Sequence, residues 1–259
     1  MKSPVPTVAI VVPCFDEAAR LDPAGLAGLA ERTGARIVLV DDGSTDGTGA
    51  LLQTLVDDQP DRFRLITLPT NVGKGETVRR GLLGALDEGA GVVGYYDADL
   101  ATPPAEMARL VQVMVDHPEL EAVMGARVGL LGHRIQRSTI RHYLGRVFAT
   151  ASSLVLGLDV YDTQCGAKVL RDGSVLRSAL AEPFQSRWAF DVELLGRLHR
   201  GTGGGEGLPA SAFREVPLTE WRDVGGTKIG LRSSMRAATD LVRIARAQRR
   251  PHGESMGTS

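Results

Sequence analysis

The chain has 259 residues, of which 43% are hydrophobic and 24% charged, so it is long enough to bury a sizeable core. Its 30 Lys and Arg residues nearly balance its 31 Asp and Glu residues, which argues against nucleic acid as a partner. No apolar run reaches the roughly 18 residues of a membrane span. Cys14 and Cys165 form no zinc-binding spacing, so we expect a cytoplasmic protein with reduced thiols that is soluble or lies peripherally on the cytoplasmic membrane face.

The first 125 residues alternate short apolar runs with amphipathic stretches, which predicts an α/β fold with a parallel sheet covered by helices. Thr45-Asp46 offers a helix N-cap, and Pro103-Pro104 suits a helix start. The predicted strands are 8–12, 36–40, 63–68, 91–96 and 121–125, and the predicted helices are 22–32, 46–58, 73–88 and 103–117.

After residue 126 the pattern changes to a basic segment, 127–146, followed by an apolar one, 147–158. Beyond these we expect a strand at 164–170, a helix at 190–199, a glycine-rich loop at 201–207, a strand at 213–218, a closing helix at 232–249 and a disordered tail at 251–259.

Acidic residues follow three of the predicted strands, at 16–17, 41–42 and 97–99. Ligands of such sheets bind at the carboxyl ends of the strands, so these clusters are predicted to converge on one edge. Asp97 and Asp99 can present hard oxygen ligands to Mg²⁺ or Mn²⁺, which would neutralise a diphosphate leaving group. Two aspartates separated by one residue, found without other acidic clusters, more often belong to a solvated turn or a helix cap. Here the neighbouring acidic clusters favour a metal site.

Two glycine-containing loops accompany the acidic clusters. Asp42 directly follows a predicted strand and can accept a hydrogen bond from a base or ribose, while Gly43 allows a close turn around the nucleotide. Lys74, in the NVGKG segment at the start of a helix, could meet an anion. The Walker A spacing is absent. An ordinary turn and a solvated lysine are the alternatives.

In order, the segments VVPCFDE, VDDGSTDGT, NVGKG, DAD, DTQCGAKVLR and RWAFDVELL resemble the family 2 inverting glycosyltransferases, over about residues 8 to 228. Within that family the chain looks like the branch acting on dolichyl or polyprenyl phosphate, and the DTQCG and RWAFDVELL segments resemble its glucosyl members. The resemblance implies a GT-A fold with a mostly parallel central sheet. It also implies one domain over 1–250, with a nucleotide-binding half at about 5–125 and an acceptor-binding half at about 126–250.

The resemblance further implies a metal-dependent hexosyltransferase that moves a hexose, with glucose favoured, from a UDP-sugar to a polyprenyl phosphate. It assigns roles to individual positions. Pro13, Phe15 and Glu17 would line the nucleoside pocket, Asp42 would accept from the base, Lys74 would lie near the diphosphate or sugar, Asp97 and Asp99 would hold Mg²⁺ or Mn²⁺, Gln164 would sit on the acceptor side of the sugar, and Lys228 would close over the diphosphate.

Asp191, in the RWAFDVELL segment, has three readings. In family members that glycosylate a hydroxyl, a carboxylate in this region is the general base. A phosphate acceptor is already an anion, so Asp191 would then orient the sugar or a catalytic arginine. The plainest reading is a carboxylate favoured by a helix N-terminus.

The basic segment bears on the acceptor. Arg134, Arg137 and Arg141 follow i, i+3, i+7 spacing, which predicts one helical face suited to the acceptor phosphate. The alternative is that residues 147–158 pack on the sheet and leave the arginines solvated. A second face is predicted to be apolar and suited to a lipid surface, with Ile140, Leu144, Val147, Ala151 and Leu154.

Three other functions compete with transfer to a lipid phosphate. The first keeps the donor but uses a soluble hydroxyl acceptor, a natural product or a glycan, with Asp191 as base. A sugar nucleotidyltransferase would carry a glycine-rich basic loop where this chain has the acidic segment 13–17. A non-catalytic binding module would be expected to have lost Asp97 or Asp99, and both are present.

Overall fold

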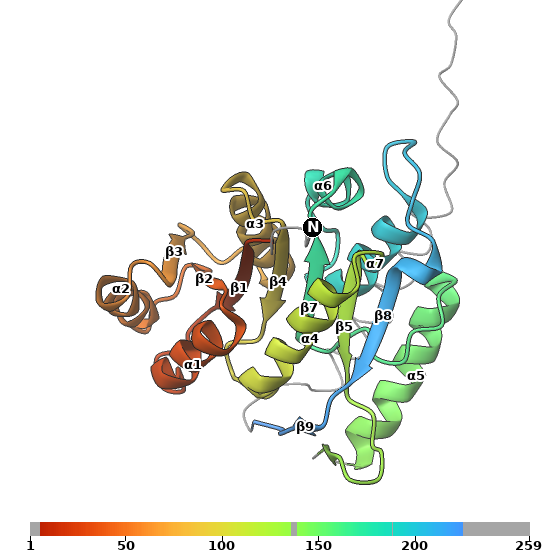
Figure 1. Ribbon diagram of the computed structural model, residues 1–259. Helices are drawn as coiled ribbons and strands as arrows, with labels where there is room; N and C mark the ends of the chain where they lie inside the picture. The colour runs from red at the N-terminus through yellow and green to blue at the C-terminus, as the bar shows by residue number, and fades with distance from the viewer. Residues whose placement is uncertain (1–5, 136–138, 188, 225–259) are drawn as a thin grey trace, which may run out of the picture.

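The computed structural model describes residues 6–135, 139–187 and 189–224, with the backbone alone for 139–147. Its main strands are β1 (Val8–Cys14), β2 (Arg36–Asp41), β3 (Phe63–Thr67), β4 (Val92–Tyr96), β5 (Ala122–Ala126), β7 (Ala167–Arg171) and β8 (Phe213–Pro217). They form one sheet in the order β3-β2-β1-β4-β7-β5-β8 (Figure 1). Only β7 runs antiparallel to its neighbours in this sheet, β4 and β5. The predicted α/β class with a mostly parallel sheet is confirmed.

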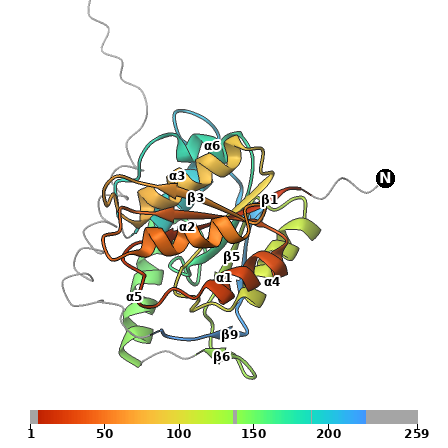
Figure 2. The same cartoon turned by 90° about the vertical axis from the view of Figure 1, so that its left-hand side faces the viewer.

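The helices are α1 (Pro23–Thr33), α2 (Thr48–Asp58), α3 (Lys74–Asp87), α4 (Pro104–Asp116), α5 (Thr139–Leu156), α6 (Ser174–Ala181) and α7 (Phe190–Arg200). They cover both faces of the sheet (Figures 1 and 2). In β1, Ile10 and Val12 pack with α1, α2 and α4, whereas Val11 packs with α3, α6 and α7. Successive strand side chains point to opposite faces, and both faces are buried here, so the strands read as continuous apolar runs.

Most predicted elements of the first 125 residues lie within one or two residues of their observed bounds. The predicted N-cap of α2 is wrong, because the cap residue is Gly47, with φ +94°. Asp46 instead accepts hydrogen bonds from the N–H of Thr48 (3.0 Å) and from its hydroxyl (2.6 Å). The strand predicted from residue 164 begins only at Ala167, and helix α6 was not predicted.

The prediction that Arg134, Arg137 and Arg141 share one helical face is wrong. Arg134 lies in the short strand β6 (Arg134–Ile135), which pairs with β9 (Glu220–Trp221). The backbone N–H of Arg134 donates to the carbonyl of Thr219 (2.8 Å), so the chain there is extended and α5 begins five residues later. Arg137 and the side chain of Arg141 lie outside the described residues, as do the predicted closing helix and tail.

The predicted apolar face of the basic segment is also divided. Leu154 is 80% exposed, whereas Ala151 and Val155 pack against a cluster that includes Met124 of β5 and Leu195 of α7. The described part of 147–158 therefore packs largely on the rest of the protein, which agrees with the alternative prediction that this segment covers the sheet. The predicted side chains Ile140, Leu144 and Val147 are not described.

Both cysteines are buried free thiols. Burial raises the pKa of Cys165 to about 11, so this thiol stays protonated and unreactive at neutral pH. Within residues 6–135, 139–187 and 189–224, no helix has the length and apolar character needed to cross a bilayer.

Candidate active site

The acidic clusters meet at the carboxyl edge of the sheet, where β1 has β2 on one side and β4 on the other. This is the switch point at which open α/β sheets bind ligands. Bonds from backbone N–H groups to side-chain hydroxyls tie the first two loops together: the N–H of Asp16 donates to Ser44 Oγ (3.0 Å) and the N–H of Glu17 donates to Thr48 Oγ1 (2.8 Å). The loops after β1 and β2 therefore form one cross-linked unit.

The predicted nucleoside pocket has one accessible aromatic face. Phe15 is 43% exposed, and Pro13 is half-buried at the end of β1. Glu17 is buried, and its carboxylate forms an ion pair with Arg20, with an Nη2–Oε1 distance of 2.6 Å. Glu17 thus stabilises its own loop, and its contact with a nucleoside stays a prediction.

Asp42 fixes the turn that leads into α3. Its Oδ1 accepts from the N–H of Val72 (2.7 Å) and its Oδ2 accepts from the N–H of Gly73 (2.9 Å). On the outer side, the Arg187 guanidinium donates to the carbonyls of Asn71 (3.1 Å) and Val72 (3.2 Å). That Asp42 accepts a hydrogen bond from the base stays a prediction, whereas in the structure its carboxylate positions the NVGKG turn.

This turn places Lys74 against the predicted metal pair. Lys74 Nζ lies 2.5 Å from Asp97 Oδ1, and both side chains are about one-third exposed. Burial lowers the pKa of Lys74, but the negative charges of Asp97 and Asp191 outweigh the effect of burial. The pKa is therefore raised, and the side chain stays protonated and positively charged at neutral pH. Burial and the neighbouring Asp97 raise the pKa of Asp99, which accepts one hydrogen bond, from the N–H of Ala101 (3.0 Å). Two repelling carboxylates beside one lysine form a site that a further cation would stabilise.

Asp191 is held in a buried polar network. Lys168 in β7 is fully buried, and its Nζ donates to Asp191 Oδ1 (2.6 Å) and to the carbonyl of Cys165 (2.6 Å). The hydroxyl of Tyr95 in β4 donates to the same Asp191 oxygen. No role for Lys168 or Tyr95 was predicted from the sequence. A signal was present, because Lys168 is the one charged residue inside the apolar run 167–170.

The loop before β7 carries Gln164 and is clamped from both sides. Arg127 binds Asp162 through two bonds, of 2.6 and 2.8 Å, and Glu215 accepts from the N–H of Asp162 (2.8 Å). Thr163 Oγ1 and Gln164 Nε2 are buried and have no hydrogen-bond partner among the residues that the structure describes. Buried polar atoms are normally paired, so these two atoms are available to a ligand.

Gly166 sets the position of Asp97. A Cβ at residue 166 would lie 2.0 Å from Asp97 Oδ2, and the N–H of Asp97 donates to the Gly166 carbonyl (3.0 Å). We therefore expect Gly166→Ala to displace Asp97 and to lower kcat/KM about 100-fold, since a shift of about 1 Å can cost that much. Steady-state kinetics would measure the loss. Gly129→Ala, whose Cβ meets no atom within 4 Å, should be silent, and equal rates for both variants would contradict the argument.

A divalent metal fits these residues through two ligands only. Among the described residues there is no group of three or more His, Cys, Asp or Glu side chains that could hold an ion. Asp97 and Asp99 would supply two carboxylates, and Mg²⁺ typically completes its shell with substrate phosphates and water. Lys228, predicted to close over the diphosphate, lies outside the described residues.

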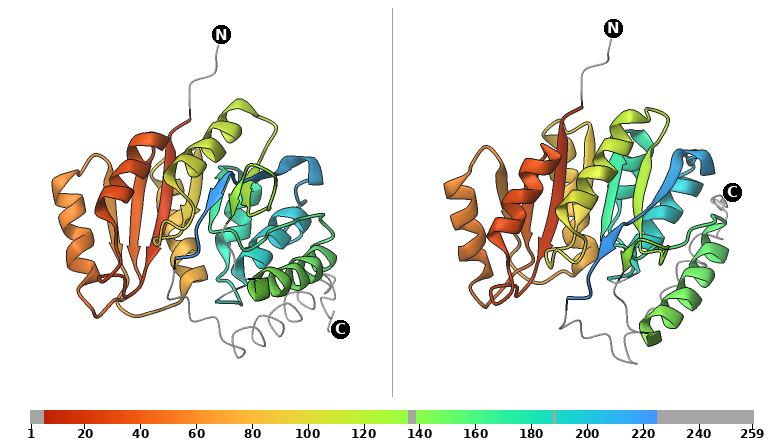
Figure 3. Two further views of the ribbon diagram at one scale, coloured as in Figure 1. Left: turned by 90° about the horizontal axis from the view of Figure 1, so that it is seen from below. Right: turned by 60° about the horizontal axis from the view of Figure 1, so that its bottom comes forward.

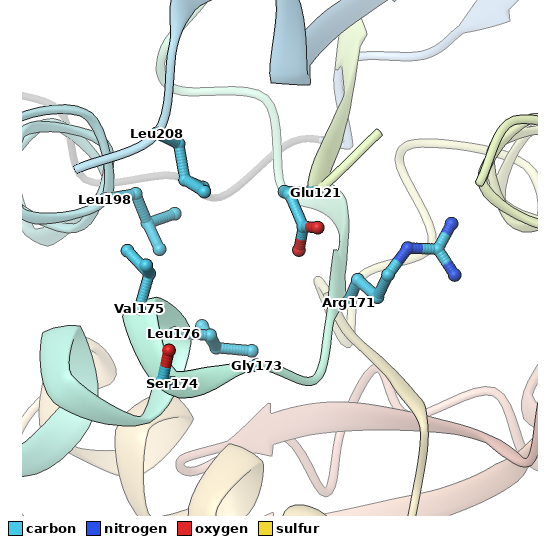
Figure 4. Close-up of a pocket in the computed structure, with 8 residues that line it drawn as sticks. All are labelled: Glu121, Arg171, Gly173, Ser174, Val175, Leu176, Leu198 and Leu208. Carbon is cyan, nitrogen blue, oxygen red and sulfur yellow. The ribbon is translucent and has the colours of Figure 1, made fainter. Parts of the chain in front are cut away.

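A separate cavity of about 120 Å³ lies at the opposite ends of the strands from the acidic clusters (Figure 4). Glu121, just before β5, points into it beside Leu176 and Leu198, while the Arg171 guanidinium points away. β5 begins and the antiparallel β7 ends here, so the cavity opens on the amino edge of the parallel strands. It is not the site of the Asp97–Asp99 pair.

The mostly parallel sheet with helices on both faces is shared with solved structures of the GT-A fold. The sequence model of Glycosyl transferase family 2 matches residues 9–176, and the chain belongs to this family. The resemblance deduced from the sequence is thereby confirmed.

Relatives and solved structures agree with this assignment. A mouse dolichyl-phosphate β-glucosyltransferase is 34% identical over 88% of this chain and 71% of its own length. A polyprenol monophosphomannose synthase of Mycolicibacterium smegmatis is 29% identical over 62% of this chain and 60% of its own. The crystal structure of glucosyl-3-phosphoglycerate synthase from Mycobacterium tuberculosis, in complex with Mn²⁺, UDP and glucosyl-3-phosphoglycerate, superposes with a TM-score of 0.66 at 18% identity. That match covers 94% of this chain and 80% of the synthase.

Proposed function

We propose that the protein is a metal-dependent inverting glycosyltransferase that moves a hexose, glucose in the first instance, from a UDP-sugar to a polyprenyl phosphate. The names of the relatives support this proposal, since several are dolichyl-phosphate β-glucosyltransferases and one is a polyprenol monophosphomannose synthase. The metal is inferred from Asp97 and Asp99 and from structural neighbours crystallised with Mn²⁺.

The donor would lie over the carboxyl ends of β1 and β4. Phe15 offers an aromatic surface for the base, and the Asp42-supported turn presents Lys74 toward the diphosphate. Mg²⁺ or Mn²⁺ bound by Asp97 and Asp99 would neutralise charge on the leaving diphosphate. Lys74, held as a cation beside Asp97, adds fixed positive charge at the same place, so stabilisation of the leaving group is largely pre-organised.

A phosphate oxygen of the acceptor would attack the anomeric carbon from the face opposite the diphosphate. The new carbon–oxygen bond forms as the bond from that carbon to the β-phosphate oxygen breaks, which releases UDP and inverts the centre. No proton has to be removed from an ionised phosphate. Thr163 Oγ1 and Gln164 Nε2, both buried and without a partner in the described part of the chain, are available to hydroxyls of the sugar or to the acceptor.

The network around Asp191 is the observation that best supports a phosphate acceptor. One Asp191 oxygen already accepts from the Lys168 ammonium and the Tyr95 hydroxyl, and the side chain is only 8% exposed. That oxygen is therefore already occupied by two donors of the protein itself. This favours a positioning role over the role of general base that a hydroxyl acceptor would require.

Paired acceptors test the proposal. With UDP-[¹⁴C]glucose and Mg²⁺ or Mn²⁺, we expect labelled lipid from a short polyprenyl phosphate and none from the polyprenol of the same chain length. GDP-mannose in place of the donor tests the choice of base and sugar. Labelling of the alcohol, or of neither lipid, would exclude the phosphate acceptor and direct the search to soluble hydroxyl acceptors.

A further inference from the structure

The turn between β5 and β6 presents two leucines to solvent. Leu131 is fully exposed and Leu130 is 48% exposed. The N–H of His133 donates to the carbonyl of Leu130 (3.0 Å), and Gly132 has φ +87°, which glycine adopts readily. The hydrogen bond and the glycine hold the leucines at the tip of a folded turn, where they do not collapse onto the protein.

Both ends of this Leu130–Leu131 turn are fixed to the protein. On one side, Arg127 is bound to Asp162 and lies over the Trp221 ring, 5.3 Å from its centroid. On the other side, β6 pairs with β9, and Ile135 and Trp221 pack against the main core. An apolar tip on a rigid base can enter an apolar phase without unfolding its support.

The turn lies at the same edge of the sheet as the active site. It follows the carboxyl end of β5, at the end of the molecule toward which the β4 arrow points (Figures 1 and 3). Just beyond β9, the N–H of Arg222 donates to the carbonyl of Ala101 (2.9 Å), two residues after Asp99. Contact by the turn with a surface would therefore bring the Asp97–Asp99 loop close to that surface.

We propose that the Leu130–Leu131 turn inserts into the surface of an anionic lipid bilayer and holds the active-site edge against it. The choice of a lipid bilayer as the binding partner rests on the proposed function, because a polyprenyl phosphate presents its phosphate at a bilayer surface. Charge supports the same choice. In β6, next to the turn, the exposed Arg134 offers a positive charge to anionic headgroups, whereas Arg222, just after β9, lies 3.6 Å from Glu220 and is followed by Asp223.

A polarity-sensitive dye on the turn tests insertion directly. Gly129→Cys leaves both leucines in place, meets no atom within 4 Å, and adds an exposed thiol to a protein whose Cys14 and Cys165 are buried. Vesicles of phosphatidylcholine with phosphatidylglycerol should shift the emission of the dye to the blue. An unchanged spectrum in the presence of bound vesicles would overturn the proposal.

Vesicle co-sedimentation gives the matched comparison. Leu130→Ser/Leu131→Ser should lower the partition coefficient at least about tenfold, the effect of withholding one leucine side chain from an apolar phase. Leu154→Ser removes another exposed leucine, in the C-terminal part of α5, and should leave binding unchanged. Equal binding by wild type and the double variant, or an equal loss in Leu154→Ser, would overturn the proposal.

Activity on a water-soluble, short-chain polyprenyl phosphate without vesicles separates this proposal from the proposed function. The double variant should keep wild-type turnover in that assay. If wild type is inactive there while vesicle binding still depends on the leucines, the proposed function fails and the membrane contact stands. If turnover is normal and vesicle binding ignores the leucines, only the membrane contact fails.

Discussion

Asp99→Asn is expected to lower kcat/KM about 1,000-fold, because a bound metal contributes several kcal/mol of charge stabilisation and each 1.36 kcal/mol is tenfold in rate. Thermal stability should not fall with it. Burial and the charge of Asp97 raise the pKa of Asp99, so the folded protein disfavours this carboxylate at neutral pH and a neutral amide removes the repulsion. Label transfer from UDP-[¹⁴C]glucose and a melting curve would measure the two effects.

Asp58→Asn is the control for this change, since Asp58 is an exposed carboxylate at the end of α2. It should alter neither rate nor melting temperature. Full activity in Asp99→Asn would remove Asp99 from the metal site. A parallel loss of folding would instead assign Asp99 a structural role.

Asp191→Asn is expected to destabilise the fold by about 3–5 kcal/mol, because it leaves the fully buried Lys168 ammonium without its counter-charge. Lys168→Met should also lower the stability of the fold, because it leaves the buried Asp191 carboxylate without its counter-charge. In the double variant Lys168→Met/Asp191→Asn, no charge remains buried in this pair, and the amide oxygen introduced at position 191 can still accept from Tyr95. Most of the stability should therefore return, as a double-mutant cycle in urea would show.

The same double variant decides the role of Asp191. If Asp191 positions other groups, restoring the fold should restore turnover of polyprenyl phosphate to within about tenfold of wild type. If it removes a proton from the acceptor, the double variant stays about 100- to 10,000-fold slow despite its recovered stability. The single variant cannot separate these cases, because its loss of folding would imitate the loss of a catalytic base.

Pattern alone located most of the sheet. Both faces of the central strands are buried, so strands such as those at 10–12 and 37–40 appear in the sequence as short continuous apolar runs. In the basic segment the pattern misled. Arg134 stands at helical spacing from Arg137 and Arg141, but a backbone hydrogen bond to Thr219 places Arg134 in an extended strand.

By itself the sequence determined the α/β class, the strand-end positions of Asp42, Asp97 and Asp99, and the family, because each depends on local order along the chain. The tertiary structure alone decided the partners. Lys168 meets Asp191, Gly166 confines Asp97, and Asp42 supports the Val72–Gly73 turn. The partners in these contacts are separated along the chain by 23, 69 and about 30 positions, respectively. The order of the strands in the sheet brings them together. Sequence spacing carries no such information, since sheet order is set by how crossovers and helices pack.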